Sequence, residues 1–79
     1  MTDIVNIAGY QFVSLDRLAE RRVDLLRECR ERFIKGTILL SSEGINLFLA
    51  GSRNAIDGFL EYLRGEEALR DFDVKESLS

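Results

Sequence analysis

Polar residues that could bind a ligand gather in one short segment, SSEGIN, between two apolar runs. The candidates are Ser41, Ser42, Glu43, Gly44 and Asn46. Serine and asparagine side chains can donate hydrogen bonds and a carboxylate can accept them, so this segment could contact a nucleotide or a neighbouring domain. The same residue types also favour a tight turn, because their side chains bind turn amides and glycine tolerates positive φ. The sequence leaves both interpretations open.

Cysteine chemistry is limited to Cys29, and the chain contains no histidine. No disulfide, Cys/His zinc site or histidine-based catalytic triad can therefore form within it. Cys29 falls late in a predicted helix on the apolar side, whereas a reactive thiol needs a positive, partly exposed setting. We predict a buried, unreactive thiol, no catalytic residue, no metal site and no cofactor in these 79 residues, and a reducing, cytoplasmic setting.

Composition is typical of one small globular domain, with 79 residues, 46% hydrophobic and 32% charged. A single core of this size supplies about 3–5 kcal/mol of stability. The net charge is −3, and the arginines alternate with acids, which argues against autonomous nucleic-acid binding because such modules carry clustered cations. No apolar run approaches the roughly 20 residues of a membrane helix, so we expect a soluble protein without a membrane partner.

Hydrophobic periodicity predicts four strands and two helices. A single domain is expected over residues 1–79, with strands at 4–13, 37–41, 45–50 and 72–78 and helices at 15–33 and 53–65. Ser14 is the predicted N-cap of the first helix. Its apolar stripe is predicted to comprise Leu15, Leu18, Leu25, Leu26, Cys29 and Phe33. In the fourth strand, Phe72, Val74 and Leu78 alternate with polar residues, as in a half-buried strand.

The order β-α-β-β-α-β predicts an α+β fold, the ferredoxin-like (acylphosphatase-like) two-layer sandwich. In this fold a four-stranded antiparallel sheet has both helices on one face, with the first and third strands in the centre. The other face has no helix to cover it.

The uncovered face is predicted to carry an apolar patch, because both hairpin strands have apolar residues at successive positions. Its candidates are Tyr10, Phe12, Leu39 or Leu40, and Phe48, and a patch of this size is typical of an interface. RNA-recognition modules of the same order stack bases on aromatics of the central strands. The third-strand segment INLFLAG has one aromatic and no cation, which argues against base stacking here.

Four segments together resemble the N-terminal domain of the rhodanese-related TrhO/YceA family: GYQFVSL, KGTILLSSEGINLFLAG, AIDGFLEYL and VKES. The resemblance runs from about Val5 to Ser79, and GTILL followed by EGIN and AG is its most specific part. It implies that the chain is an N-terminal fragment of a tRNA uridine hydroxylase, which forms 5-hydroxyuridine at wobble position 34 with molecular oxygen.

The resemblance also implies that a rhodanese domain follows, and that its loop carries the cysteine expected to do the chemistry. Cys29 does not match that cysteine. The fragment is then an accessory domain whose uncovered face packs on the rhodanese domain and whose turn helps to orient tRNA.

Two other functions stay open. The chain could be a stand-alone module that forms a homodimer through the uncovered face. It could also be an acylphosphatase-like hydrolase, although the loop VSLDRL lacks the glycines of a phosphate cradle and Arg17 is expected to lie inside the helix.

Overall fold

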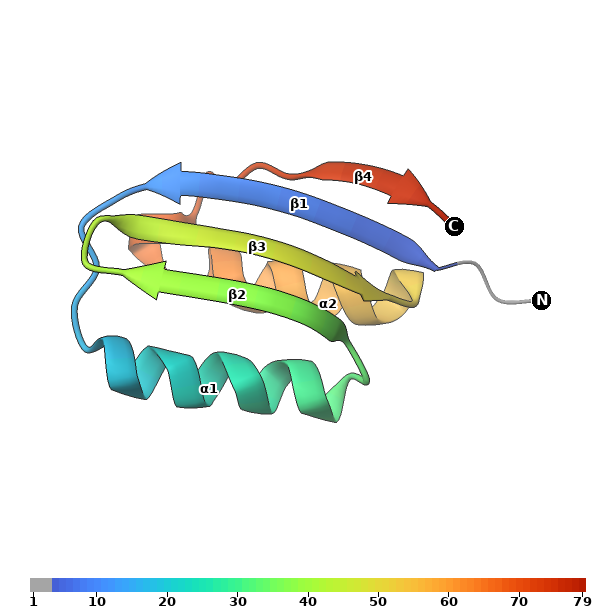
Figure 1. The fold of residues 1–79 in the computed structure, drawn as a ribbon, viewed down its shortest axis with the longest axis horizontal. Coiled ribbons are helices and arrows are strands. Elements are labelled where there is room, and N and C mark those ends of the chain that lie inside the picture. Colours follow the sequence, from blue (N-terminus) through green and yellow to red (C-terminus); the bar gives the residue numbers. More distant parts are fainter. Residues whose placement is uncertain (1–3) are drawn as a thin grey trace.

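The computed structural model describes residues 4–79 and confirms the α+β ferredoxin-like fold (Figure 1). Its elements are β1 (Val5–Phe12), α1 (Leu18–Glu31), β2 (Lys35–Ser41), β3 (Gly44–Gly51), α2 (Arg53–Arg64), the short 3-10 helix η1 (Glu67–Leu69) and β4 (Lys75–Leu78).

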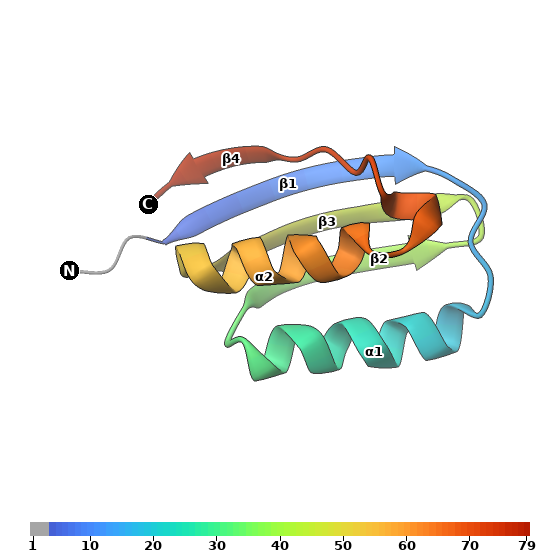
Figure 2. The ribbon, with the colours of Figure 1, turned by 180° about the vertical axis from the view of Figure 1, so that it is seen from behind.

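The four strands form one antiparallel sheet in the order β2-β3-β1-β4, with β3 and β1 in the centre as predicted. Ala8 of β1 lies opposite Phe48 of β3, and Thr37 of β2 lies on the other side of Phe48. Seen from behind, α2 lies over the centre of the sheet, roughly along the strand direction, and α1 runs along β2 (Figure 2). Both helices therefore cover the same side of the sheet.

The core lies between this side of the sheet and the helices. Ile7, Leu47 and Leu49 point inward from the strands, while Ile56 and Phe59 of α2 are fully buried against them. Buried and exposed residues alternate along each strand because successive side chains point to opposite faces of the sheet. The residues before and after each core residue in a strand therefore point to the uncovered face.

The first helix begins three residues later than predicted, at Leu18. Its N-cap is Arg17, which has φ 48° and makes no side-chain cap, so Ser14 does not cap the helix. The reason is tertiary: the backbone amides of Val13 and Leu15 donate to carbonyls of the β2–β3 turn at 3.0 and 3.1 Å. These bonds hold residues 13–15 against the hairpin and keep them out of the helix.

The same helix ends at Glu31 in a Schellman motif. Phe33 takes the left-handed conformation at φ 58°, and its amide donates to Arg30 O. The amide of Ile34 donates to Cys29 O at 2.9 Å, and both of these side chains are buried. Phe33 is therefore turned into solvent with 87% of its surface exposed, which contradicts its predicted place on the apolar stripe.

The fourth strand is shorter than predicted because η1 and an irregular segment precede it. Phe72 is buried before the strand begins, where Arg64 Nε donates to its carbonyl at 2.9 Å. Leu78 is exposed rather than half-buried. The other boundaries agree with the prediction to within two residues, the usual uncertainty of element ends.

Candidate binding surfaces

The SSEGIN segment is held by its own hydrogen bonds. Ser41 Oγ accepts a hydrogen bond from the backbone amide of Glu43 at 3.1 Å. This is an ST turn, in which a serine side chain binds a turn amide, as the second of the two interpretations of this segment predicts. The carbonyls of Ser42 and Glu43 accept from the β1–α1 connection. A Cβ at Gly44 would lie 2.2 Å from Gln11 O, so glycine is required for the close approach of β1 and β3. The backbone and Ser41 thus serve the fold.

Asn46 lies on the outward side of β3, the side that also carries Tyr10, Phe12, Leu39 and Phe48. We call the outward side of the four strands the sheet face. The last four residues expose 67, 81, 60 and 61% of their surface. Leu40 points inward and packs on the core, so Leu39, and not Leu40, belongs to the sheet face.

Two rings of the sheet face touch each other. Tyr10 and Phe12 meet edge to face, with 5.6 Å between ring centroids and 79° between ring planes. Phe48 lies diagonally across from Tyr10, since Phe48 pairs with Ala8 and Tyr10 pairs with Asn46. Ala8, the residue opposite Phe48, has a small side chain, and Phe48 keeps 61% of its surface exposed.

The register adds residues that the sequence analysis missed. The outward positions that it missed are Asn6, Ala8, Thr37, Ala50, Ser77 and the two lysines, Lys35 and Lys75; Ser41, already a candidate, also points outward. Lys35 pairs with Ala50, and Lys75 pairs with Ala8. Strand alternation gives the outward set of each strand, but the register between strands is needed to join the sets.

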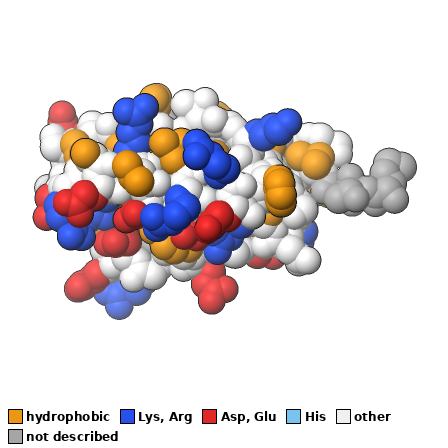
Figure 3. Space-filling view, turned by 90° about the horizontal axis from the view of Figure 1, so that it is seen from below, with side chains coloured by type: hydrophobic (Ala, Val, Ile, Leu, Met, Phe, Trp, Pro, Cys, Tyr) orange, Lys and Arg blue, Asp and Glu red, His pale blue; other side chains and the backbone are white. Residues whose placement is uncertain are grey.

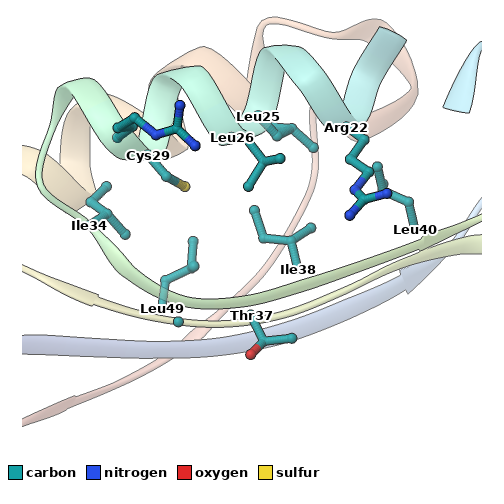
Figure 4. A pocket seen from close by; sticks show the side chains of 11 residues that line it. Arg22, Leu25, Leu26, Cys29, Ile34, Thr37, Ile38, Leu40 and Leu49 are labelled. Carbon is teal, nitrogen blue, oxygen red and sulfur yellow. The ribbon is translucent and has the colours of Figure 1, made fainter. Parts of the chain in front are cut away.

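A second surface is a groove of about 390 Å³ between α1 and β2 (Figure 4). Leu26 of α1 points toward Ile38 of β2 across it, with Arg22 toward one end. Leu26 is half-exposed, so the first helix buries a narrower stripe than predicted. The groove is also lined by the apolar residues Leu25, Cys29, Ile34, Leu40 and Leu49, and by Arg30. On this side of the molecule, acidic and basic groups alternate with exposed apolar ones (Figure 3).

Cys29 is buried, as predicted, at the inner wall of that groove. Burial raises the pKa of its thiol above the ordinary value, and Glu28 raises the pKa further while Arg32 opposes the shift. A raised pKa leaves less thiolate at neutral pH, which is the opposite of an activated nucleophile.

The loop before α1 was the candidate phosphate cradle of an acylphosphatase-like site. Arg17 lies at its end as the N-cap and not inside the helix, and its guanidinium is 3.6 Å from Glu20. Within residues 4–79, no three His, Cys, Asp or Glu side chains are placed to hold a metal ion together. None of the helices described is long and apolar enough to cross a membrane.

Comparison with known proteins places this geometry in a family. Residues 4–79 match the family model described as UPF0176 acylphosphatase like domain. A tRNA uridine(34) hydroxylase of Bordetella petrii is 53% identical over 79 residues, which are all of this chain and 31% of that protein.

Two further relatives carry the same name. The protein of Ralstonia nicotianae is 54% identical over 76 residues, covering 96% of this chain and 27% of the relative. That of Bordetella pertussis is 49% identical over 79 residues, covering all of this chain and 32% of the relative. The chain thus spans about a third of the length of these relatives, and it belongs to the UPF0176 acylphosphatase-like domain family.

Proposed function

We propose that this chain is the accessory, noncatalytic N-terminal domain of a cytoplasmic enzyme that hydroxylates uridine 34 of tRNA. The observation that carries the proposal is identity of about one half, along the whole chain, to proteins named tRNA uridine(34) hydroxylase. The chain accounts for only about a third of their length, so the catalytic groups are assigned to the remainder, where the TrhO/YceA resemblance expects a rhodanese domain.

The chemistry of the described residues supports a noncatalytic role. The one thiol is buried with a raised pKa. Ser41 is engaged in its turn, and Arg17 lies beside Glu20. What the domain offers instead is surface: the sheet face and the α1–β2 groove.

We place the contact with the remainder of the parent at the groove, in place of the sheet face predicted from sequence. The groove walls are aliphatic, so an apolar side chain inserted there would bury Leu26 and Ile38. Arg22 and Arg30 have no ion-pair partner among residues 4–79, so acidic groups beside that side chain would complement them.

The function is tested in cells that lack the endogenous hydroxylase. The full-length protein should restore 5-hydroxyuridine at position 34, measured by mass spectrometry of tRNA nucleosides. The same protein without residues 1–79 should give much less, and residues 1–79 alone should give none. Full modification without the domain, or modification by the domain alone, would refute the accessory role.

The docking surface is tested by Leu26→Asp in the full-length protein. A carboxylate in the groove should loosen the contact between the domain and the remainder, which limited proteolysis between them would detect. Val23→Asp is the matched control, because Val23 is exposed on the same helix but does not line the groove. Equal proteolysis of both variants and wild type would place the contact elsewhere.

A further inference from the structure

The charge of the sheet face differs from that of the rest of the chain. Lys35 and Lys75 are the only lysines in the sequence, and both point outward from the edge strands. No outward side chain of the four strands is acidic, but Glu43 of the β2–β3 turn lines the same hollow as Tyr10, Phe12 and Asn46. In a chain of net charge −3, the outward strand positions carry two lysines and no acid, which favours an anionic ligand at this face.

The aromatic residues of this face lie on the central strands and the two cations on the edges; along the strands, Lys75 is level with Phe48 and Lys35 with Ala50, while Tyr10 and Phe12 lie further toward the β2–β3 turn. Tyr10 and Phe12 are on β1 and Phe48 is on β3, the two central strands, while the lysines are on the two edges. Three strand spacings separate the edges, or about 14 Å. Phe48 and Tyr10 are diagonal neighbours, about 7–8 Å apart, so each ring can take a separate flat ligand group.

From this arrangement we infer that the sheet face binds unpaired RNA bases, with Phe48 and Tyr10 as stacking platforms and Lys35 and Lys75 on the phosphates. Rings that stack bases and cations that follow the backbone are the two requirements for binding a single strand. Asn46 lies between Tyr10 and Leu39, where its amide can meet a base edge. The inference rests on the proposed function, which supplies tRNA as the RNA, and an anticodon loop offers such bases.

Base stacking is disfavoured when the third strand is considered by itself, since that strand lacks a cation and has a single aromatic. In the assembled sheet, β1 supplies two more rings and the edge strands supply the cations. Two lysines give a weak electrostatic contribution, so the domain by itself is expected to bind RNA weakly, in the range that an NMR titration detects.

The first test is a titration of the 79-residue protein with a labelled single-stranded RNA heptamer of anticodon-loop sequence, followed by NMR and fluorescence anisotropy. Phe48→Ala and Tyr10→Ala should each weaken binding about fivefold or more, the usual loss for one stacked base. Phe48→Tyr should retain binding, and Phe33→Ala, which removes an exposed ring outside the sheet face, should not change it.

The salt dependence of RNA binding distinguishes the contribution of the two lysines from that of the aromatic rings. Phosphate contacts on a single strand contribute about −0.7 each to the slope of log affinity against log salt. Lys35→Gln with Lys75→Gln should therefore make the slope shallower by about 1.4, while Phe48→Ala leaves it unchanged. Absence of heptamer binding by the wild-type protein, or a Phe48→Ala variant that binds like Phe33→Ala, would overturn the inference.

A second test uses the full-length protein. Lysine-specific acetylation read by mass spectrometry should modify Lys35 and Lys75 in the free protein and spare them when tRNA is added. Protection without tRNA would mean that protein covers the face, either the parent's remainder or a second copy, and would overturn the inference. Restored 5-hydroxyuridine in the same protein would leave the proposed function standing, so the two failures are distinguishable.

Discussion

Arg53, the first residue of α2, binds Glu76 of β4 through two hydrogen bonds of 3.1 and 3.0 Å. This ion pair joins an edge strand to a helix on the covered side of the sheet. Arg53 also approaches Asp57 at 3.3 Å, so one guanidinium links two carboxylates. Because β4 has only four residues, it is the shortest strand of the sheet, and this ion pair links it to α2.

The first prediction concerns pH. The hydrogen bonds from Arg53 lower the pKa of Glu76, so the pair stabilises the fold fully above the ordinary glutamate pKa of about 4.3. The contribution is lost as pH falls through the lowered pKa of the folded state. Glu76→Gln should therefore lower Tm slightly at pH 7 and leave it equal to wild type at strongly acidic pH.

Thermal unfolding at several pH values and salt concentrations checks this. Both groups are exposed, so salt should shrink the difference at pH 7. Glu61→Gln is the control, because Glu61 is exposed on α2 and forms no ion pair within residues 4–79. A Glu76→Gln effect that persists unchanged at acidic pH would contradict the assignment.

The second prediction concerns the core. Phe59→Ala should cost about 3–5 kcal/mol, which is as large as the whole stability expected for a core of this size. The variant should be largely unfolded at 25 °C by circular dichroism. Ile56→Val, at an equally buried site of α2, should cost only about 0.5–1.5 kcal/mol in urea unfolding and keep the fold.

The third prediction concerns the end of α1. Phe33 holds a left-handed conformation that costs an ordinary residue about 1–2 kcal/mol, and its ring is almost wholly exposed. Phe33→Gly should therefore stabilise the protein by about 1 kcal/mol, measured by urea unfolding. Phe33→Ala keeps the conformational cost and should stay near wild type; equal stabilisation by both changes would show that the backbone is not the cause.

The fourth prediction contrasts two glycines. A Cβ at Gly9 would lie 2.7 Å from the backbone oxygen of Asp73, so Gly9→Ala should force β1 and the segment before β4 apart and cost about 1–3 kcal/mol. A Cβ at Gly58 would meet Arg32 Nε at 3.2 Å, so the Arg32 side chain, which is paired with Glu28, must move by only a few tenths of an ångström. Gly58→Ala should stabilise α2 by up to about 1 kcal/mol. Urea unfolding of both variants measures the two changes in stability, and a destabilised Gly58→Ala or an unchanged Gly9→Ala would contradict the prediction.

The fifth prediction concerns Cys29. Burial and a raised pKa should make its alkylation at neutral pH far slower in the folded protein than in denaturant, as followed by mass spectrometry. Leu26→Ala, which thins the outer wall of the groove, should speed the reaction. Rapid labelling of the folded wild-type protein would show that the thiol is accessible.

The sequence alone was sufficient for the fold class and for the two alternating sets of side chains on each strand. Alternation is a local property, so residue types and spacing assign Phe48 and Tyr10 to strands and make them candidates for the uncovered face. The lone Cys29 on an apolar stripe was likewise enough to predict a buried thiol.

Tertiary structure decided what no local pattern contains. Carbonyls of the β2–β3 turn accept hydrogen bonds from the amides of Val13 and Leu15, so α1 begins later than the local pattern predicts. A Schellman motif at the other end of α1 turns Phe33 outward. The register of the sheet brings Lys35 and Lys75 to the same face as the aromatics, although the two lysines are 40 positions apart in the sequence. Pairing between strands is a long-range choice, and it made a positive aromatic surface from residues that appear unrelated along the chain.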